Sequence, residues 1–204
     1  MNKIELKSKV NRATKWATIT EIIAKLISPI TIMILARLLA PEAFGVVAAA
    51  TMVFSFADML TDAGFQKYLV QHDFIDSEHK EDSTNVAFWT NLTISLLLWG
   101  TIIVFREQIA AIVGSPGLGL VIAIACAQLP ITSFSSIQMA LYRRDFDFKT
   151  LFFIRIIGIC IPFVVTIPLA LLGLDYWALI IGTISGASIN AIILTLKSKW
   201  KPQL

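Results

Sequence analysis

Residues 151–172 read LFFIRIIGICIPFVVTIPLALL and contain a single charged side chain, Arg155. A helix needs about 20 apolar residues to cross the hydrocarbon core of a bilayer, which is about 30 Å thick. One such stretch could be a buried helix of a soluble protein, but six in 204 residues could not. The sequence therefore predicts an all-α integral membrane protein, a bundle of six transmembrane helices. The predicted spans are residues 14–38, 43–66, 84–105, 117–138, 151–172 and 174–196.

These spans divide the chain into three parts. Residues 1–13 are predicted to form a polar, amphipathic cytoplasmic lead, residues 14–196 the six-span lobe, and residues 197–204 a basic cytoplasmic tail. Hydrophobic residues make up 56% of the chain and the mean hydropathy is +0.76. Soluble domains contain about 45–50% apolar residues, so the composition agrees with a membrane protein.

Positive charge is distributed unevenly between the two sides of the predicted bundle. If the spans alternate in direction, thirteen of the 17 Lys and Arg residues lie on one side, and Arg37 and Arg106 lie on the other. The positive-inside rule then places both termini in the cytoplasm. Because the basic clusters adjoin spans, they indicate topology signals and contacts with anionic lipid rather than nucleic-acid binding. The thirteen residues are Lys3, Lys7, Lys9, Arg12, Lys15, Lys67, Lys80, Arg143, Arg144, Lys149, Lys197, Lys199 and Lys201.

Five charged residues lie well inside the predicted spans, away from the first and last two positions, where charge is costly and therefore usually functional. Their depths, counted at about 1.5 Å per residue, predict a Glu21–Lys25–Asp58 cluster near mid-membrane. The same count predicts an Asp62–Arg155 pair near the cytoplasmic end. The alternative for the shallow Asp62 and Arg155 is structural pairing or snorkelling to the membrane surface. Lys25 and Asp58 lie deeper, which favours a water-filled cavity.

Several spans also contain residues that interrupt or polarise a helix. Prolines inside spans remove a backbone hydrogen bond and often mark broken helices, which transporters use as hinges. Polar amides inside spans either line a polar interior or form hydrogen bonds between helices. Gly158, Gly182 and Gly186 are typical of close helix packing. The prolines are Pro29, Pro130, Pro162 and Pro168, and the amides are Asn91, Gln128 and Asn190.

No motif in the chain predicts catalysis, a cofactor or a metal site. There is no G-x-x-x-x-G-K-[ST] sequence for binding nucleotide phosphates. His72 and His79 lie in a polar loop without the spacing of metal ligands, and Cys126 and Cys160 lie within spans as apolar fillers. We therefore expect no catalytic residue, no cofactor and no metal, and a protein that is not an enzyme.

Five stretches, in order along nearly the whole chain, resemble one family. They are ILARLLAPEAFGVVAAAT (34–51), ADMLTDAGF with LVQ (57–71), TNVAFWTN (84–91), LYRRDFDFK (141–149) and GLDYWAL (173–179). Together they are similar to the amino-terminal half of bacterial polysaccharide flippases of the colanic-acid-exporter type. These flippases belong to the multidrug/oligosaccharidyl-lipid/polysaccharide exporter superfamily.

The resemblance implies one lobe of a 12- to 14-span alternating-access transporter in the bacterial inner membrane. The implied substrate is an undecaprenyl-pyrophosphate-linked oligosaccharide, flipped between leaflets for surface polysaccharide or lipopolysaccharide synthesis. Pyrophosphate needs cationic partners, so Lys25, Arg37 and Arg155 are the candidate substrate contacts. Glu21, Asp58 and Asp62 are the candidates for ion coupling.

Two other functions remain open on the same scaffold. One is an ion-coupled exporter of small molecules, of the multidrug type, and the other is a non-transporting assembly subunit of a polysaccharide machinery. The family continues into a second lobe where this sequence stops, at Leu204. The chain is thus expected to be a fragment, or a half-transporter that pairs with a second lobe or with its own copy.

Overall fold

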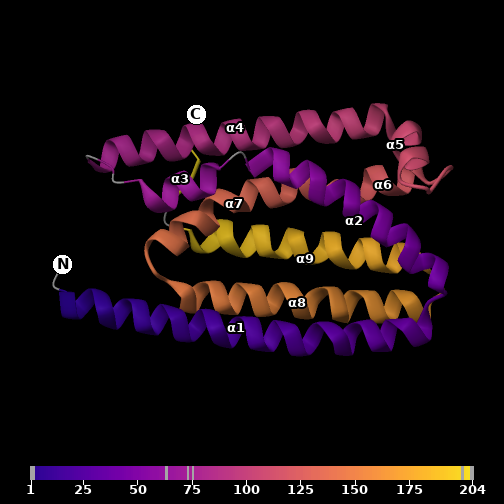
Figure 1. Cartoon of the computed structure of the whole chain (residues 1–204), viewed down its shortest axis with the longest axis horizontal. Coiled ribbons are helices and arrows are strands. Elements are labelled where there is room, and N and C mark those ends of the chain that lie inside the picture. The colour runs from indigo at the N-terminus through magenta and orange to yellow at the C-terminus, as the bar shows by residue number, and fades with distance from the viewer. Residues whose placement is uncertain (1–2, 63, 73, 75, 199, 203–204) are drawn as a thin grey trace.

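The computed structural model describes residues 3–62, 64–72, 74, 76–198 and 200–202, and only the backbone of residues 3–13, 28 and 77. This part of the chain forms nine helices and no strand (Figure 1). Helix α1 begins and α9 ends at one end of the bundle, the terminal end; the opposite end is the loop end. The helices are α1 (Lys3–Leu38), α2 (Pro41–Asp62), α3 (Phe65–Gln71), α4 (Ser77–Val104), α5 (Arg106–Ile112), α6 (Gly119–Ala125), α7 (Gln128–Arg144), α8 (Phe148–Leu171) and α9 (Tyr176–Lys197).

Six helical segments are long and apolar enough to cross a membrane, and each overlaps one predicted span. The prediction of an all-α membrane bundle is therefore confirmed. The fourth segment is the central one, because half of it is buried within the protein, against 11–28% of the others. The segments are Thr14–Leu38, Pro41–Asp62, Glu78–Val104, Gly119–Arg144, Phe148–Leu171 and Tyr176–Lys197.

The fourth segment is a broken helix, formed by α6 and α7 in succession. Pro130 has no N–H group to donate to the carbonyl of Cys126, which accepts from the N–H of Leu129 instead. The N–H of Ala127 likewise bonds one residue short, to Ile124, which leaves the carbonyl of Ala123 without its helical partner. The indole N–H of Trp99 on α4 donates to this carbonyl at 2.9 Å. By contrast, α1 and α8 continue through their prolines.

Loss of the Trp99 indole hydrogen bond should destabilise the broken span. We expect Trp99→Phe to lower the free energy of unfolding by about 1–3 kcal/mol, because a buried carbonyl loses its donor. Denaturant unfolding in detergent micelles measures this. The control is Trp177→Phe, since Trp177 packs on the same apolar core and its indole donates no hydrogen bond within the described residues. Equal losses in the two variants would mean that packing, and not the hydrogen bond, stabilises the break.

Helices α8 and α9 form the most extensive helix pair of the described bundle. Glycines allow this close approach, as the sequence predicted. A Cβ atom on Gly158 would collide with the amide of Asn190, and a Cβ on Gly182 would collide with the hydroxyl of Thr166. A Cβ on Gly186 would lie only 2.7 Å from the Cγ of Pro162.

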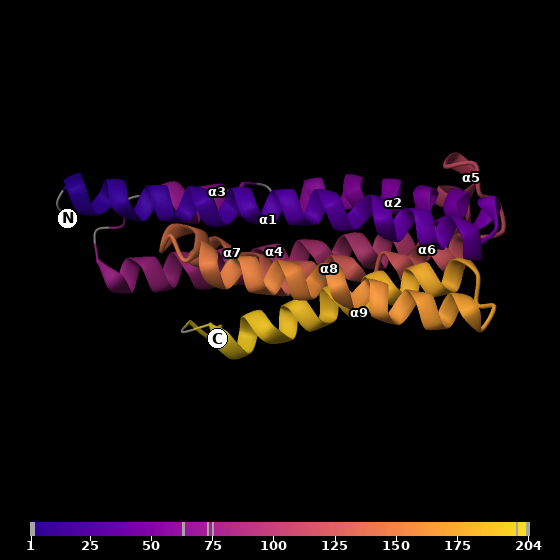
Figure 2. The same cartoon turned by 90° about the horizontal axis from the view of Figure 1, so that it is seen from below.

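Helix α1 is the peripheral element of the bundle. The short connection after Leu38 predicts that the first two spans pack as antiparallel neighbours, but α1 packs against α8, whereas α2 packs against α4, α6, α7 and α9. The two helices are close at the loop end and diverge toward the terminal end (Figure 1). Figure 2 shows that both lie on one side of the bundle, which we call the α1–α2 face, opposite the C-terminal part of α9.

Candidate functional site

An ion pair joins α1 to α8 within the membrane-spanning region. The Oε1 atom of Glu21 lies 2.9 Å from Nη1 of Arg155, and both side chains are 51% exposed. The helices run in parallel register, because Trp16 contacts Phe152 with ring centroids 5.0 Å apart and Leu35 shares an apolar cluster with Ala170. This packing brings the glutamate and the arginine together although they are far apart in the sequence.

This pairing corrects the predicted Asp62–Arg155 pair. Arg155 contacts Glu21 because α8 packs along α1, while α2 diverges from α1 toward the terminal end. The predicted Glu21–Lys25–Asp58 cluster is not joined by ion pairs either. Within the described residues, no carboxylate lies within 4.0 Å of the Lys25 ammonium and no cation lies within 4.0 Å of Asp58. Lys25 is exposed and carries an uncompensated charge.

Four polar residues of α2 recur at positions i, i+4, i+7 and i+11 and therefore share one side of the helix. Asp58 is exposed, and Asp62 is half-buried with an Oδ1 atom that has no hydrogen-bond partner. The neighbouring side of α2, about a third of a turn away and carrying Ala50 and Ala57, is buried in the bundle core. The four residues are Thr51, Ser55, Asp58 and Asp62.

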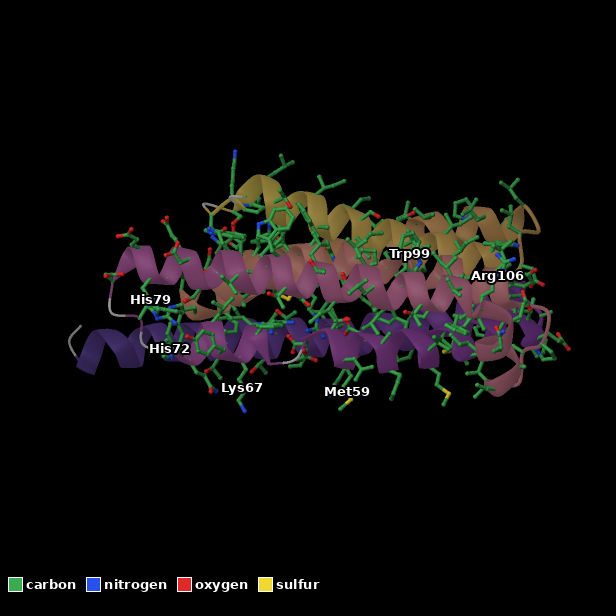
Figure 3. The ribbon with its side chains drawn as sticks, turned by 90° about the horizontal axis from the view of Figure 1, so that it is seen from above. Met59, Lys67, His72, His79, Trp99 and Arg106 are labelled. Atoms are coloured by element: carbon green, nitrogen blue, oxygen red, sulfur yellow. The ribbon has the colours of Figure 1, made fainter. Side chains whose placement is uncertain are left out.

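The direction of this polar side follows from helix geometry. Met59 points away from the bundle on the α1–α2 face (Figure 3). Helix α2 runs from the loop end to the terminal end, and successive residues of a right-handed helix turn by about 100°. Asp58 therefore lies on the side of α2 that faces α1, not the side that faces α4. The polar side of α2 is thus turned toward α1, the helix that carries Glu21 and Lys25.

Arg37 does not join this group. It is exposed in the last turn of α1, at the loop end. Sixteen residues separate it from Glu21, a distance of about 24 Å along the helix. The structure therefore brings Glu21 and Arg155 together, keeps Lys25 one turn away, and leaves Arg37 apart.

The polar amides mostly link helices. Asn91 donates to Ser136 at 2.7 Å and Gln128 donates to Thr183 at 3.3 Å, which supports the second of the two predicted roles. Sequence reasoning missed Gln138, which is fully buried with both amide atoms lacking a partner among the described residues. The polar residues of α7 recur at helical spacing, a signal that could have found Gln138. They are Gln128, Thr132, Ser135 and Gln138.

Two cavities lie elsewhere, at the terminal end. One, of about 670 Å³, lies between α4, α7 and the end of α9, and includes none of the six predicted site residues. The hydroxyl of Tyr142 in its wall donates to the carbonyl of Lys197 at 2.7 Å. Among the described residues, no three His, Cys, Asp or Glu side chains are grouped so as to hold a metal ion.

Comparison with known proteins places this fold in a family. Residues 34–204 match the family model described as polysaccharide biosynthesis protein. The chain belongs to this family. The match covers every element from the last turns of α1 onward, including Asp58, Asp62 and Arg155 but not Glu21 and Lys25.

Curated relatives extend the similarity to almost the whole chain. The succinoglycan biosynthesis transport protein ExoT of Rhizobium meliloti is 29% identical over 95% of the chain and 38% of its own length. The lipopolysaccharide biosynthesis protein WzxC of Escherichia coli is 21% identical over 95% of the chain and 38% of its own length. An uncharacterized membrane protein in the cps region of Klebsiella pneumoniae is 23% identical over 94% and 39%.

The chain thus spans about two-fifths of the length of the curated relatives that it matches. No solved structure matches it. The family and the six apolar helices together establish a multi-pass membrane protein with a role in polysaccharide biosynthesis.

Proposed function

We propose that this protein takes part in moving a lipid-pyrophosphate-linked oligosaccharide from the inner to the outer leaflet of the bacterial cytoplasmic membrane. Both termini would lie in the cytoplasm, as the positive-inside rule predicts. The proposed reaction reorients an intact lipid and makes no bond, so it requires no catalytic residue and no cofactor. The observation that carries the proposal is the set of charged, exposed side chains within the spans formed by α1, α2 and α8.

Exposed charged side chains within the spans are costly in hydrocarbon. A charged side chain at the centre of a membrane helix costs about 2.5–3.5 kcal/mol on insertion scales. Lys25, Asp58 and the Glu21–Arg155 pair are exposed in this lobe, so a lipid environment there would be unfavourable. The surface around these side chains is better suited to water, a polar substrate or a second protein surface. A second lobe or a second copy of the chain would enclose this surface as one wall of a transport path.

Lys25 is the proposed contact for the substrate pyrophosphate, since it has no ion-pair partner in the described residues. Arg155 would share this role when Glu21 releases it. Glu21, Asp58 and Asp62 are proposed to couple transport to an ion. Arg37 lies too far along α1 to bind the same pyrophosphate.

Complementation tests this proposal in a strain that lacks its polysaccharide flippase. The chain is produced in two forms, one by itself and one fused to the part of a full-length relative that the chain does not cover. Surface polysaccharide is measured for each form. We expect Lys25→Gln to lower surface polysaccharide at least ten-fold in whichever form is active, and Lys25→Arg to retain most of it. The matched control is Lys15→Gln, because Lys15 is an exposed cation at the start of the membrane-spanning part of the same helix. Full activity of Lys25→Gln would remove Lys25 from the transport path.

The alternative of an ion-coupled small-molecule exporter draws on Asp58 and Asp62, which share one side of α2. It predicts proton-dependent efflux of cationic compounds that is lost in Asp58→Asn.

A third possibility is an assembly subunit that transports nothing. It predicts that polysaccharide production depends on the chain but survives neutralisation of Lys25 and Asp58 together.

A further inference from the structure

Helix α3 is a short amphipathic helix at the terminal end of the second span. The chain turns at Gly64, whose φ of +85° is a left-handed conformation that favours glycine, and α3 follows at once. Leu69 is fully buried in a cluster with Ala87 and Phe88. Lys67 lies on the exposed side of α3. Because α3 begins just beyond a span, this exposed side lies at the level of lipid headgroups.

Two consecutive arginines at the end of α7 contact α3 in different ways. Nη1 of Arg144 donates to the carbonyls of Leu69 and His72, at 2.7 Å and 2.6 Å, and its guanidinium lies 4.7 Å from the centre of the Phe74 ring. Arg144 thus caps the C-terminal end of α3. Arg143 is exposed, and its Nη1 donates to the side-chain carbonyl of Gln66 at 3.2 Å. Its partner is neutral, so the positive charge of Arg143 is not compensated.

Lys67 follows Gln66 directly, so the lysine and the residue that Arg143 contacts are neighbours on α3. Across the described ranges, no carboxylate lies within 4.0 Å of either group. Lys67 points away from the bundle in the same direction as Met59, toward the α1–α2 face (Figure 3). Two cations without a carboxylate partner therefore lie at α3, just beyond the end of the second span, and Lys67 points from the α1–α2 face (Figure 3).

We propose that Lys67 and Arg143 form a binding site for the phosphate group of a membrane lipid, with Gln66 holding the arginine in position. A guanidinium and an ammonium side by side suit phosphate oxygens, since both donate charge-assisted hydrogen bonds. The phosphate can come from an anionic phospholipid or from the diphosphate of a lipid-linked sugar. The second source rests on the proposed function, and the site would then receive the substrate before it enters the membrane-spanning region.

The test uses the whole chain in phosphatidylcholine nanodiscs and two probes. One probe is fluorescent farnesyl diphosphate, followed by anisotropy, and the other is fluorescent phosphatidylglycerol, followed by energy transfer from tryptophan. Each cation near an anionic surface contributes roughly a five-fold gain in affinity, so Lys67→Gln with Arg143→Gln should weaken binding about 25-fold. The matched control is Lys149→Gln with Lys201→Gln, two exposed cations of the same end.

Weaker binding of either probe in the first double variant, with normal binding in the control, supports the lipid-phosphate site and identifies the source. Equal effects in both double variants, or none in the first, overturn it. The far-ultraviolet circular dichroism spectrum checks that α3 remains folded. If the first double variant binds both probes normally while Lys25→Gln abolishes polysaccharide export, the site is wrong and the proposed function stands. If it loses diphosphate binding while Lys25→Gln exports normally, the site stands and the role of Lys25 fails.

Discussion

Arg155→Ala is expected to lower the free energy of unfolding by about 3 kcal/mol and to reduce the amount of chain inserted in the membrane. The variant removes the ion-pair partner of Glu21 within the first span, and a charge without such a partner in a membrane helix costs about 2.5–3.5 kcal/mol on insertion scales. Its partner in the native protein lies 2.9 Å away. Chemical unfolding in lipid nanodiscs gives the free energy, and fractionation of cell membranes gives the inserted amount.

A double-mutant cycle separates this pairing from general packing. Glu21→Ala with Arg155→Ala should recover much of the loss, because neither charge then remains alone, and the exchange Glu21→Arg with Arg155→Glu should recover it too. The matched control is Arg106→Ala, which removes an exposed pair with Glu107, 3.7 Å apart at the loop end. Exposed pairs contribute about 0–1 kcal/mol. Additive losses from the Glu21 and Arg155 single variants would contradict the pairing.

Gly182→Ala should destabilise the protein although alanine favours helices. Its Cβ would collide with the hydroxyl of Thr166, lie 3.2 Å from the carbonyl oxygen of Pro162, and force α8 and α9 apart. Thr166 is 3% exposed, so its side chain is enclosed by the protein. Overpacking of this kind costs about 1–3 kcal/mol, and Gly182→Val should cost more. Thermal unfolding in detergent, followed by circular dichroism, measures the loss.

A second glycine, Gly45, is the control that separates the effect of close packing on stability from the helix propensity of alanine. Gly45 on α2 is exposed, and nothing lies within 4 Å of a Cβ added to it, so Gly45→Ala should be neutral or stabilising. Adding Thr166→Ala to Gly182→Ala should restore part of the stability, because it removes the atom that collides. If Gly45→Ala and Gly182→Ala shift the unfolding temperature in the same direction, close packing is not what Gly182 provides.

Arg155 was predicted to pair with Asp62, but it pairs with Glu21. Counting residues along a helix gives depth, and depth alone placed Arg155 level with Asp62. The contact also depends on which side of each helix faces which neighbour, and the structure places α8 on α1. The same reason explains the first connection: a short turn after Leu38 requires α1 and α2 to run antiparallel, but it does not make them pack.

Local sequence properties determined the class of this protein. Apolar stretches of about 20 residues need no partner to define a span, because every backbone group of a membrane helix is satisfied within the helix itself. Six such stretches therefore predicted the bundle, and Gly158, Gly182 and Gly186 predicted close packing without naming the neighbour.

Only the tertiary structure decided the pairing of Glu21 with Arg155, the hydrogen bond from Trp99 to the broken fourth span, the burial of Gln138 and the different roles of Arg143 and Arg144. Each of these depends on groups more than 20 residues apart meeting at one place. Side-chain packing between helices selects that arrangement, and its energy is shared among many contacts, so no single stretch of the sequence contains it.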